Sequence, residues 1–516
     1  MGRVGKTYYS QKLDDLLSKA SDEEFCQLVW SVDALQSERV EAASKFVTFP
    51  PQAAVPNIAS EYAIYKWELE TLITRLLSVP KQHLATRRLN CGVFNAAALV
   101  TKHLRKLENA ESGLYLKRFG IFNELHRIGQ RQFPWQRGYF NTPQFVRYAY
   151  IYNHGQAKSY FEQSHHLSIN DFSLIGFGLY WACSQNPWIH RSFSFKEIGL
   201  RRETVEAGLK LLSIGVHEAQ KEATAFMGEK QIPTAYRKSL LRQHPIIAFN
   251  EKQDGLIAPL PQLILLRVTA GVFYDLVGGP SSIRNEASAR FEQYSLEFMR
   301  AMMPSFDVRK GERYLKGGNT IEAPDILVSE GGQLTIVIEC KARRLSFDAQ
   351  FGEDPVKDAQ QGYTEMGKGV FQLWRYFSHL RRGIVPNTFL TGSAHGVVLT
   401  LDPWLTMSEK LREHVESMAH RQADADDGIT AEDRRPVIFC SIADFELVIR
   451  DTDEREFLRV LMATREARFR NWLLPGVSRD LGVQRQSLRP FPISVGTVLP
   501  WWDTIPGMRV GDDTGK

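Results

Sequence analysis

The sequence predicts two parts: a mostly α-helical region over residues 1–280 and an α/β domain over residues 281–475, followed by a Pro- and Gly-rich tail over residues 476–516. Two observations predict this division. Apolar residues recur three or four positions apart through much of the first part, as one face of an amphipathic helix requires. After Gly278-Gly279-Pro280 the pattern changes to one helix followed by short runs rich in β-branched residues, which are typical of strands.

The composition is that of a globular protein. The chain has 516 residues, of which 43% are hydrophobic and 24% charged, and this length corresponds to two or three domains. No stretch approaches the roughly 18 uninterrupted apolar residues of a membrane span, and the first residues lack the apolar core of a signal peptide. The five cysteines are scattered, without a C-x-x-C pair, which favours reduced thiols. We therefore expect a cytoplasmic protein without a membrane partner.

The first part contains several amphipathic segments separated by Pro- and Gly-bearing stretches. The clearest are Gln11–Lys19, Glu23–Gln36, Tyr62–Leu77 and Val93–Leu107. Residues 1–280 contain 33 Lys and Arg against 25 Asp and Glu, and the remainder contains 31 against 34. An excess of positive charge favours a polyanionic partner, but a generic basic surface explains the same balance. The role of this region does not follow from its pattern.

One segment of the first part interleaves arginines with aromatic residues. It is RIGQRQFPWQRGYF, residues 127–140, and it includes Arg131 and Arg137. Nucleic-acid grooves combine arginine, which binds phosphate, with aromatic faces, on which bases stack. Arg131 and Arg137 are therefore weak candidates for nucleic-acid contacts. The alternative is an ordinary aromatic packing site surrounded by arginines.

The second part predicts a definite order of elements. A helix comes first, then three short strands, a long helical pattern and two further strands. Glycines 362, 367 and 369 weaken the first half of the long pattern, so the firm helix is expected from about Lys368. The predicted elements are Arg284–Met303, Phe306–Tyr314, Ala323–Val328, Leu334–Glu339, residues 356–380, Gly396–Leu401 and Pro436–Ile442.

The most informative segment is a predicted β-hairpin over residues 321–344. Residues alternate faces along a strand, so Glu339 and Lys341 share one face, while the other face is apolar and is the natural core side. With a three-residue or bulged turn, Asp325 lies opposite Glu339 and points the same way. A two-residue turn would send Asp325 to the core face. Burial of an unpaired carboxylate is costly, so the sequence favours the three-residue or bulged form.

Such a hairpin brings together groups that suit a metal-dependent reaction. Asp325 and Glu339 supply the hard oxygen ligands that Mg²⁺ (or Mn²⁺) prefers, and the backbone oxygen of Cys340 lies between them as a further ligand. Lys341 is placed to position a water molecule or to stabilise negative charge. The alternative for Glu339 and Lys341 is an exposed ion pair on an edge strand.

The motif Pro324-Asp325, thirteen intervening residues and Glu339-Cys340-Lys341 resembles the PD-(D/E)XK nuclease superfamily, whose fold is restriction-endonuclease-like. The resemblance covers roughly residues 281–445 and includes the order helix, three strands, helix, strand. It implies Mg²⁺-dependent hydrolysis of DNA phosphodiester bonds, with Asp325, Glu339 and Lys341 as catalytic residues.

Two further elements of this superfamily have counterparts in the chain. Many members carry an acidic residue on the opening helix, and RFEQYSLEFM offers Glu292 for that role, with Glu286 in reserve. RecB-type members carry Q-x-x-x-Y on the next helix, which Gln372 and Tyr376 match. This implies catalytic support from Gln372 and a nucleic-acid contact from Tyr376. As surface residues beside an apolar stripe, the pair needs no function.

The sequence thus predicts a metal-dependent DNA nuclease. A large helical region fused to such a domain resembles the layout of bacterial anti-phage and restriction-type effectors, in which that region senses a trigger, binds DNA or assembles homo-oligomers. Two alternatives stay open. One is a nucleic-acid-binding or scaffold protein with a catalytically silent fold. The other is a nuclease subunit that depends on a separate motor or regulator protein, since the chain has no G-x-x-x-x-G-K-[ST] loop.

Overall fold

The computed structural model describes residues 2–505 apart from residues 56, 58, 83–87, 120, 230–231, 251, 253, 406 and 486. The end of the predicted tail, residues 506–516, lies outside the described residues. The chain divides into two compact units. Unit 1 comprises residues 1–124, 131–141 and 158–279, and unit 2 comprises residues 125–130, 142–157 and 280–516. Two short segments within the predicted helical region therefore group with the second unit.

Unit 1 is rich in helices and contains a four-stranded sheet. The strand order is β1-β4-β3-β2. This sheet is absent from the sequence prediction, because strands of three or four residues are too short to show a period. The helices that lie wholly or partly in unit 1 are α1 Gly2–Ser18, α2 Asp22–Leu35, α3 Val40–Ser44, α4 Lys66–Ser78, α5 Phe94–Phe119, α6 Ile121–Arg137, α8 Gly155–His165, α9 Ile169–Gln185, α10 Arg202–Leu212, α11 Val216–Gly228, α12 Gln262–Val268 and α13 Val272–Leu276. The strands are β1 Trp188–His190, β2 Ser213–Gly215, β3 Ile246–Phe249 and β4 Gly255–Ile257.

Local sequence signals explain where several helices begin. Ser21 caps α2, and its side chain accepts a hydrogen bond from the backbone N–H of Glu24. Three acidic residues in the first turn of α2 also favour the positive end of the helix dipole. Helix α20 (Glu454–Ala463) begins with a reciprocal capping box between Asp453 and Glu456.

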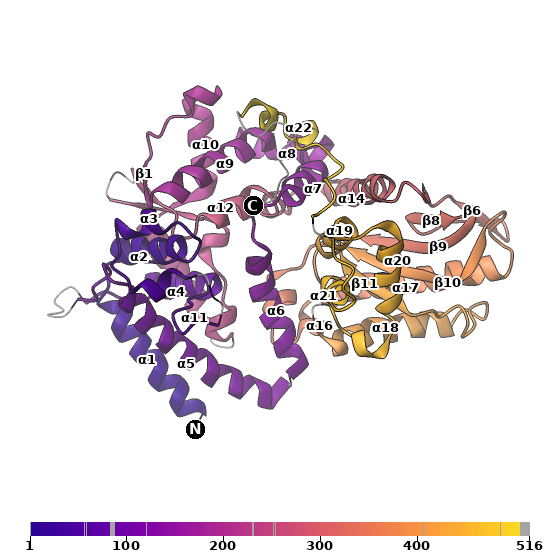
Figure 1. Ribbon diagram of the computed structural model, residues 1–516, viewed down its shortest axis with the longest axis horizontal. Helices are drawn as coiled ribbons and strands as arrows, with labels where there is room; N and C mark the ends of the chain where they lie inside the picture. The colour runs from indigo at the N-terminus through magenta and orange to yellow at the C-terminus, as the bar shows by residue number, and fades with distance from the viewer. Residues whose placement is uncertain are drawn as a thin grey trace. The chain divides into compact units, whose positions relative to one another are not determined.

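Unit 2 is built around a five-stranded mixed sheet with the order β11-β10-β9-β8-β5 (Figure 1). Strands β5, β8 and β9 are antiparallel neighbours, whereas β9, β10 and β11 run parallel. A separate antiparallel hairpin is formed by β6 and β7. The strands are β5 Asp307–Lys310, β6 Tyr314–Lys316, β7 Asn319–Ile321, β8 Ile326–Glu330, β9 Gln333–Lys341, β10 Phe389–Thr400 and β11 Val437–Ser441.

Helices cover both faces of this sheet (Figure 1). Helix α17 packs on β9 and β10, and α14 packs on β5 and β9. Because β9 is a central strand, Val337 and Ile338 are both buried although they point to opposite faces. The sequence predicted a single core face for this strand. The helices of unit 2 outside unit 1 are α7 Thr142–Tyr152, α14 Ser281–Met302, α15 Phe347–Phe351, α16 Pro355–Asp358, α17 Gln360–Arg381, α18 Glu409–Asp424, α19 Ile442–Asp451, α20 Glu454–Ala463, α21 Leu474–Asp480 and α22 Val495–Val498.

Helix α17 begins earlier than the glycines predict. It starts at Gln360 rather than near Lys368. A Cβ on Gly362 would lie 2.0 Å from the ring of Trp404, and a Cβ on Gly369 would lie 3.0 Å from Cε of Lys341. These glycines therefore permit close packing, and the tertiary contacts outweigh their low helix propensity.

The described residues agree with two further expectations from composition. All five cysteines lie among them; each is buried, and none forms a disulfide. Across the same part of the chain, no helix combines the length and apolar character needed to span a membrane.

Candidate active site

The β8–β9 hairpin has a short turn and a bulge. Gly331 and Gly332 form a two-residue turn with φ of +56° and +81°, which glycine adopts without steric cost. The register then shifts between Val328 and Ser329, so that Thr335 is an extra residue on β9. The hydroxyl of Thr335 donates a hydrogen bond to the carbonyl of Val328 at 3.1 Å and closes the bulge. Of the two forms that the sequence favoured, the hairpin is therefore the bulged one; its turn has two residues rather than three, and the bulge lies within the strands.

The bulge determines which way Asp325 points. Beyond it, Ile326 pairs with Ile338, so Asp325, one residue earlier, lies opposite Glu339. The carboxylate of Asp325 accepts a hydrogen bond from the backbone N–H of Cys340 at 2.7 Å. The N–H and C=O of one strand residue point to the same side. The carbonyl of Cys340 therefore faces the Asp325 side, where β8 has already ended.

Lys341 connects the hairpin to helix α17. Its Nζ donates hydrogen bonds to Oε1 of Glu339 at 2.7 Å and to Oε1 of Gln372 at 3.2 Å. Gly369, one turn before Gln372, allows α17 to approach the end of β9 closely enough for this contact. The side chain of Lys341 is 19% exposed, so the amine lies at the opening of a largely buried cluster.

The structure distinguishes between the two acidic residues proposed on α14. Glu292 is half-buried, and both Asp325 and Lys341 influence its pKa. Glu286 instead accepts a hydrogen bond from the backbone N–H of Gln156 at 2.8 Å and lies 3.3 Å from His154. Glu292 is therefore the α14 carboxylate that belongs to the site.

Carboxyl groups outnumber amines in this buried cluster, and burial and crowding raise their pKa values. Burial, and then the proximity of Asp325, raise the pKa of Glu339 to about 7. The same two causes raise the pKa of Glu292 to about 7, and burial raises the pKa of Asp325. Burial would lower the pKa of Lys341, but Glu339 and Asp325 outweigh it and raise this pKa. The lysine therefore stays charged, while Glu339 and Glu292 are only partly ionised at neutral pH.

Sequence reasoning missed one basic neighbour of the cluster. Lys310 is exposed at the end of β5 and lowers the pKa of both Glu292 and Asp325. It pairs across the sheet with Ile326, the residue that follows Asp325. The pairing of β5 with β8 would have located Lys310, but the sequence predicted a strand continuing to Tyr314 and so no definite register.

The donor set fits a Mg²⁺ ion better than a soft metal. The described residues contain no group of three or more His, Cys, Asp or Glu side chains arranged to hold a metal ion by themselves. Mg²⁺ needs fewer protein ligands, because it usually binds one or two carboxylates and retains several waters. Asp325, Glu339 and the carbonyl of Cys340 provide hard oxygens, and a cation among them would offset the repulsion between the carboxyl groups.

The remaining predicted residues lie away from this cluster or are buried. Arg131 is 8% exposed and forms a two-point ion pair with Glu108, which indicates a structural role within unit 1. Arg137 is exposed on the last turn of α6. Tyr376 is 2% exposed and packs in the core beneath α17, so its ring does not reach solvent for a direct nucleic-acid contact.

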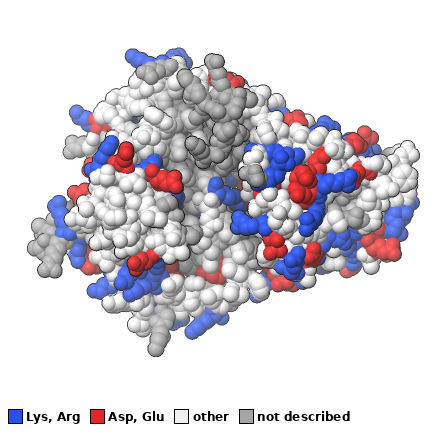
Figure 2. All heavy atoms as spheres, viewed as in Figure 1, with Lys and Arg blue, Asp and Glu red and all other residues white. Residues whose placement is uncertain are grey.

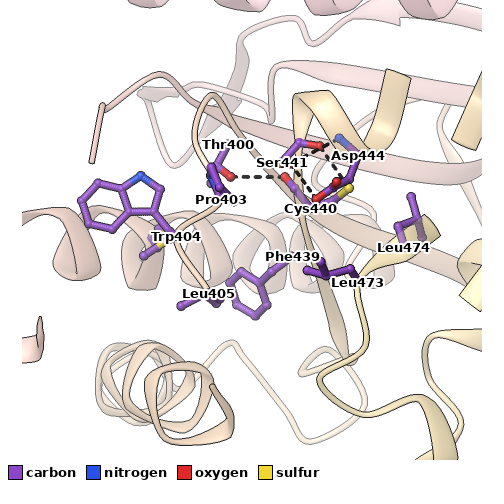
Figure 3. A pocket seen from close by; sticks show the side chains of 11 residues that line it. Thr400, Pro403, Trp404, Leu405, Phe439, Cys440, Ser441, Asp444, Leu473 and Leu474 are labelled. Carbon is purple, nitrogen blue, oxygen red and sulfur yellow. Dashed lines mark hydrogen bonds between the residues drawn. The ribbon is translucent and has the colours of Figure 1, made fainter. Parts of the chain in front are cut away.

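A small cavity of about 30 Å³ is lined by Thr400, Ser441 and Asp444 among others (Figure 3). Cross-strand pairing aligns Lys341 with Thr400 and Thr400 with Ser441, and the latter two line the cavity. The hydroxyl of Ser441 donates to Asp444 at 2.8 Å. The cavity has room for little more than a water molecule, so we assign no ligand to it.

Comparison with protein-family models, curated proteins and solved structures finds no match for the chain. Functional inference therefore depends on the geometry and chemistry of the site itself.

Proposed function

We propose that the chain is a Mg²⁺-dependent nuclease that hydrolyses DNA phosphodiester bonds. The observation that carries the proposal is the convergence of Asp325, Glu339 and Lys341 at the end of one hairpin, where carboxyl groups outnumber the amine. A structural ion pair needs no excess of carboxyl groups over amines, whereas a site for a divalent cation does.

Each residue has a distinct role in this proposal. Asp325 and Glu339 hold the cation with the carbonyl of Cys340. When bound, Mg²⁺ polarises the phosphate and lowers the pKa of a bound water. Lys341 stays protonated and stabilises negative charge on the phosphate oxygens, while Gln372 holds its amine in position. Glu292, whose pKa is raised to about 7, can accept or release a proton near neutral pH.

The assignment to the PD-(D/E)XK superfamily, with a restriction-endonuclease-like core in unit 2, is part of the same proposal. It is supported by the order of elements from α14 to β11 and by the opposed positions of Asp325 and Glu339 in the hairpin. DNA is proposed as the substrate because most members of that superfamily cut DNA. The defence role rests on the layout alone, and a separate motor or regulator protein fits the same layout.

The decisive experiment measures cleavage of supercoiled and linear DNA by the purified full chain, in Mg²⁺ or in EDTA. Cleavage should require Mg²⁺ and should be lost in Lys341→Ala. Glu292→Gln should slow cleavage, whereas Glu286→Gln, on the same helix, should not. Cleavage in EDTA, or unchanged cleavage by Lys341→Ala, would contradict the proposed site. Mg²⁺-independent binding without cleavage would favour the scaffold alternative.

A further inference from the structure

One face of α17 carries a row of polar residues that passes the proposed catalytic centre. Lys368, Gln372, Arg375, His379 and Arg382 recur at spacings of four and three, which places them on one side of the helix. We call these five residues the α17 stripe. At 1.5 Å per residue, the stripe is about 21 Å long. Gln372, which bonds to Lys341, belongs to it, so the stripe passes the site and continues towards the C-terminus of the helix.

Some basic residues of unit 2 pair with acids, but within the described part of the chain the cations of the α17 stripe do not. Figure 2 shows Lys and Arg alternating with Asp and Glu on much of the face that it draws. Examples within unit 2 are the pairs of Arg455 with Glu330 and Arg434 with Asp424. Among the described residues, neither Lys368, Arg375 nor Arg382 has an ion-pair partner. Their charge is therefore available to an external anion.

The β6–β7 hairpin adds a further cation beside the stripe. The hydroxyl of Tyr314 lies 2.7 Å from Nδ1 of His379, so this contact fixes the base of the hairpin on α17 and buries the histidine. Burial, followed by the charges of Lys316, Arg375 and Arg382, lowers the pKa of His379 to about 4. All three cations therefore lie near His379, with Asp426 as an opposing charge, and Lys316 also lacks an ion-pair partner among the described residues.

The two directions along α17 from Gln372 are not equivalent. Two turns towards the N-terminus, Glu365 forms a two-point ion pair with Arg343 at 2.7 Å, and that end is neutralised. Towards the C-terminus, Arg375, Lys316 and Arg382 are all unpaired within the described part of the chain. On the N-terminal side, the only unpaired cation of the stripe among the described residues is Lys368, so most of the unpaired positive charge lies on the C-terminal side.

We propose that Arg375, Lys316 and Arg382 bind the phosphates of the DNA backbone on one side of the scissile bond. This proposal rests on the proposed nuclease function, because it states which residues hold the DNA substrate beside the same site. Arg375 and Arg382 are about 10 Å apart along the helix axis, which corresponds to about three base pairs of duplex DNA. Contacts to phosphate position the DNA without reading its sequence.

The test measures binding of a fluorescein-labelled 20-base-pair DNA duplex by anisotropy in EDTA, where Mg²⁺-dependent cleavage is absent. The triple variant Lys316→Gln, Arg375→Gln and Arg382→Gln should bind about 100-fold more weakly at low salt. Each lost phosphate contact should reduce the slope of log affinity against log salt by about 0.9. Lys410→Gln on α18, which removes an exposed cation away from the stripe, should leave affinity and slope unchanged.

The outcomes separate this proposal from the proposed function. If the triple variant binds like the wild type while Lys341-dependent cleavage persists, the proposed phosphate contacts of the three cations are contradicted and the nuclease function stands. If the wild type binds through the three cations but never cleaves DNA, the nuclease function is contradicted and the proposed phosphate contacts stand. A wild-type protein that does not bind the duplex at low salt contradicts the proposed phosphate contacts. Equal weakening with an RNA duplex would show that the three cations bind phosphate without regard to the sugar.

Discussion

Glu70 in unit 1 and Glu339 in unit 2 are both almost completely buried, at 5% and 4% exposed, yet their environments are opposite. Glu70 accepts hydrogen bonds from Arg242 at 2.7 and 3.2 Å and from the indole N–H of Trp135 at 2.8 Å. Burial alone would raise its pKa, but these partners lower it. Glu339 has Lys341 as a cationic partner and Asp325 as a repelling neighbour, and its pKa is raised to about 7.

This difference indicates what to look for in a buried acid. A carboxylate that serves the fold is surrounded by enough donors to keep it ionised, as Glu70 is. A carboxylate that serves a reaction is held with an incomplete set of partners, so that a cation or substrate can complete it. Burial by itself distinguishes neither case. The predictions below test this contrast, beginning with the largest expected effect.

The largest effect is expected on cleavage. Asp325→Asn should lower the rate of Mg²⁺-dependent plasmid nicking by about 10³-fold, because a carboxylate that holds the cation is lost. The cleavage rate of Glu70→Gln should stay within about twofold of the wild-type rate at 25 °C, where the protein remains folded. Comparable losses in both variants would remove the distinction between the two acids.

Stability should show the reverse pattern. Glu70→Gln leaves the charge of Arg242 without its partner and should cost about 3 kcal/mol, or about 6–12 °C in melting temperature. Glu339→Gln removes repulsion with Asp325, so its melting temperature should be unchanged or higher. Thermal unfolding of both variants in EDTA measures the contrast. A larger destabilisation by Glu339→Gln would indicate a structural ion pair with Lys341.

Mg²⁺ should stabilise the wild-type protein without any substrate. At ten times the dissociation constant, binding to the folded state contributes about 1.4 kcal/mol. The resulting rise in melting temperature should be lost in Asp325→Asn and retained in Glu70→Gln. Equal shifts in all three proteins would place the cation elsewhere.

The smallest effect is expected from Gln372, which acts through Lys341. Gln372→Ala should lower kcat about fivefold and leave KM unchanged, because the amine of Lys341 loses one of its two hydrogen bonds. Gln372→Glu, which keeps an oxygen acceptor, should recover part of the rate. A change in KM alone would instead indicate that Gln372 binds substrate.

The sequence was most informative where a costly alternative could be excluded. The penalty for burying Asp325 predicted the bulged hairpin, and strand alternation predicted that Glu339 and Lys341 share a face. Lys310 and the α17 start at Gln360 could not be predicted in this way. The first depends on the pairing of β5 with β8, and the second depends on contacts of Gly362 and Gly369 with distant residues.

The register beyond the bulge at Thr335 also constrains how the length of this chain can change over generations. Because side chains alternate with a period of two, removing one residue between the bulge and Glu339, such as Val337, would place Asp325 opposite Cys340 while every acidic and basic group of the site remained in the gene; removing Thr335 itself would only remove the bulge. A single-residue deletion that removes no acidic residue is therefore expected to remove the site as completely as substitution of Asp325. Inheritance of the reaction would depend on spacing as much as on the identity of the acids.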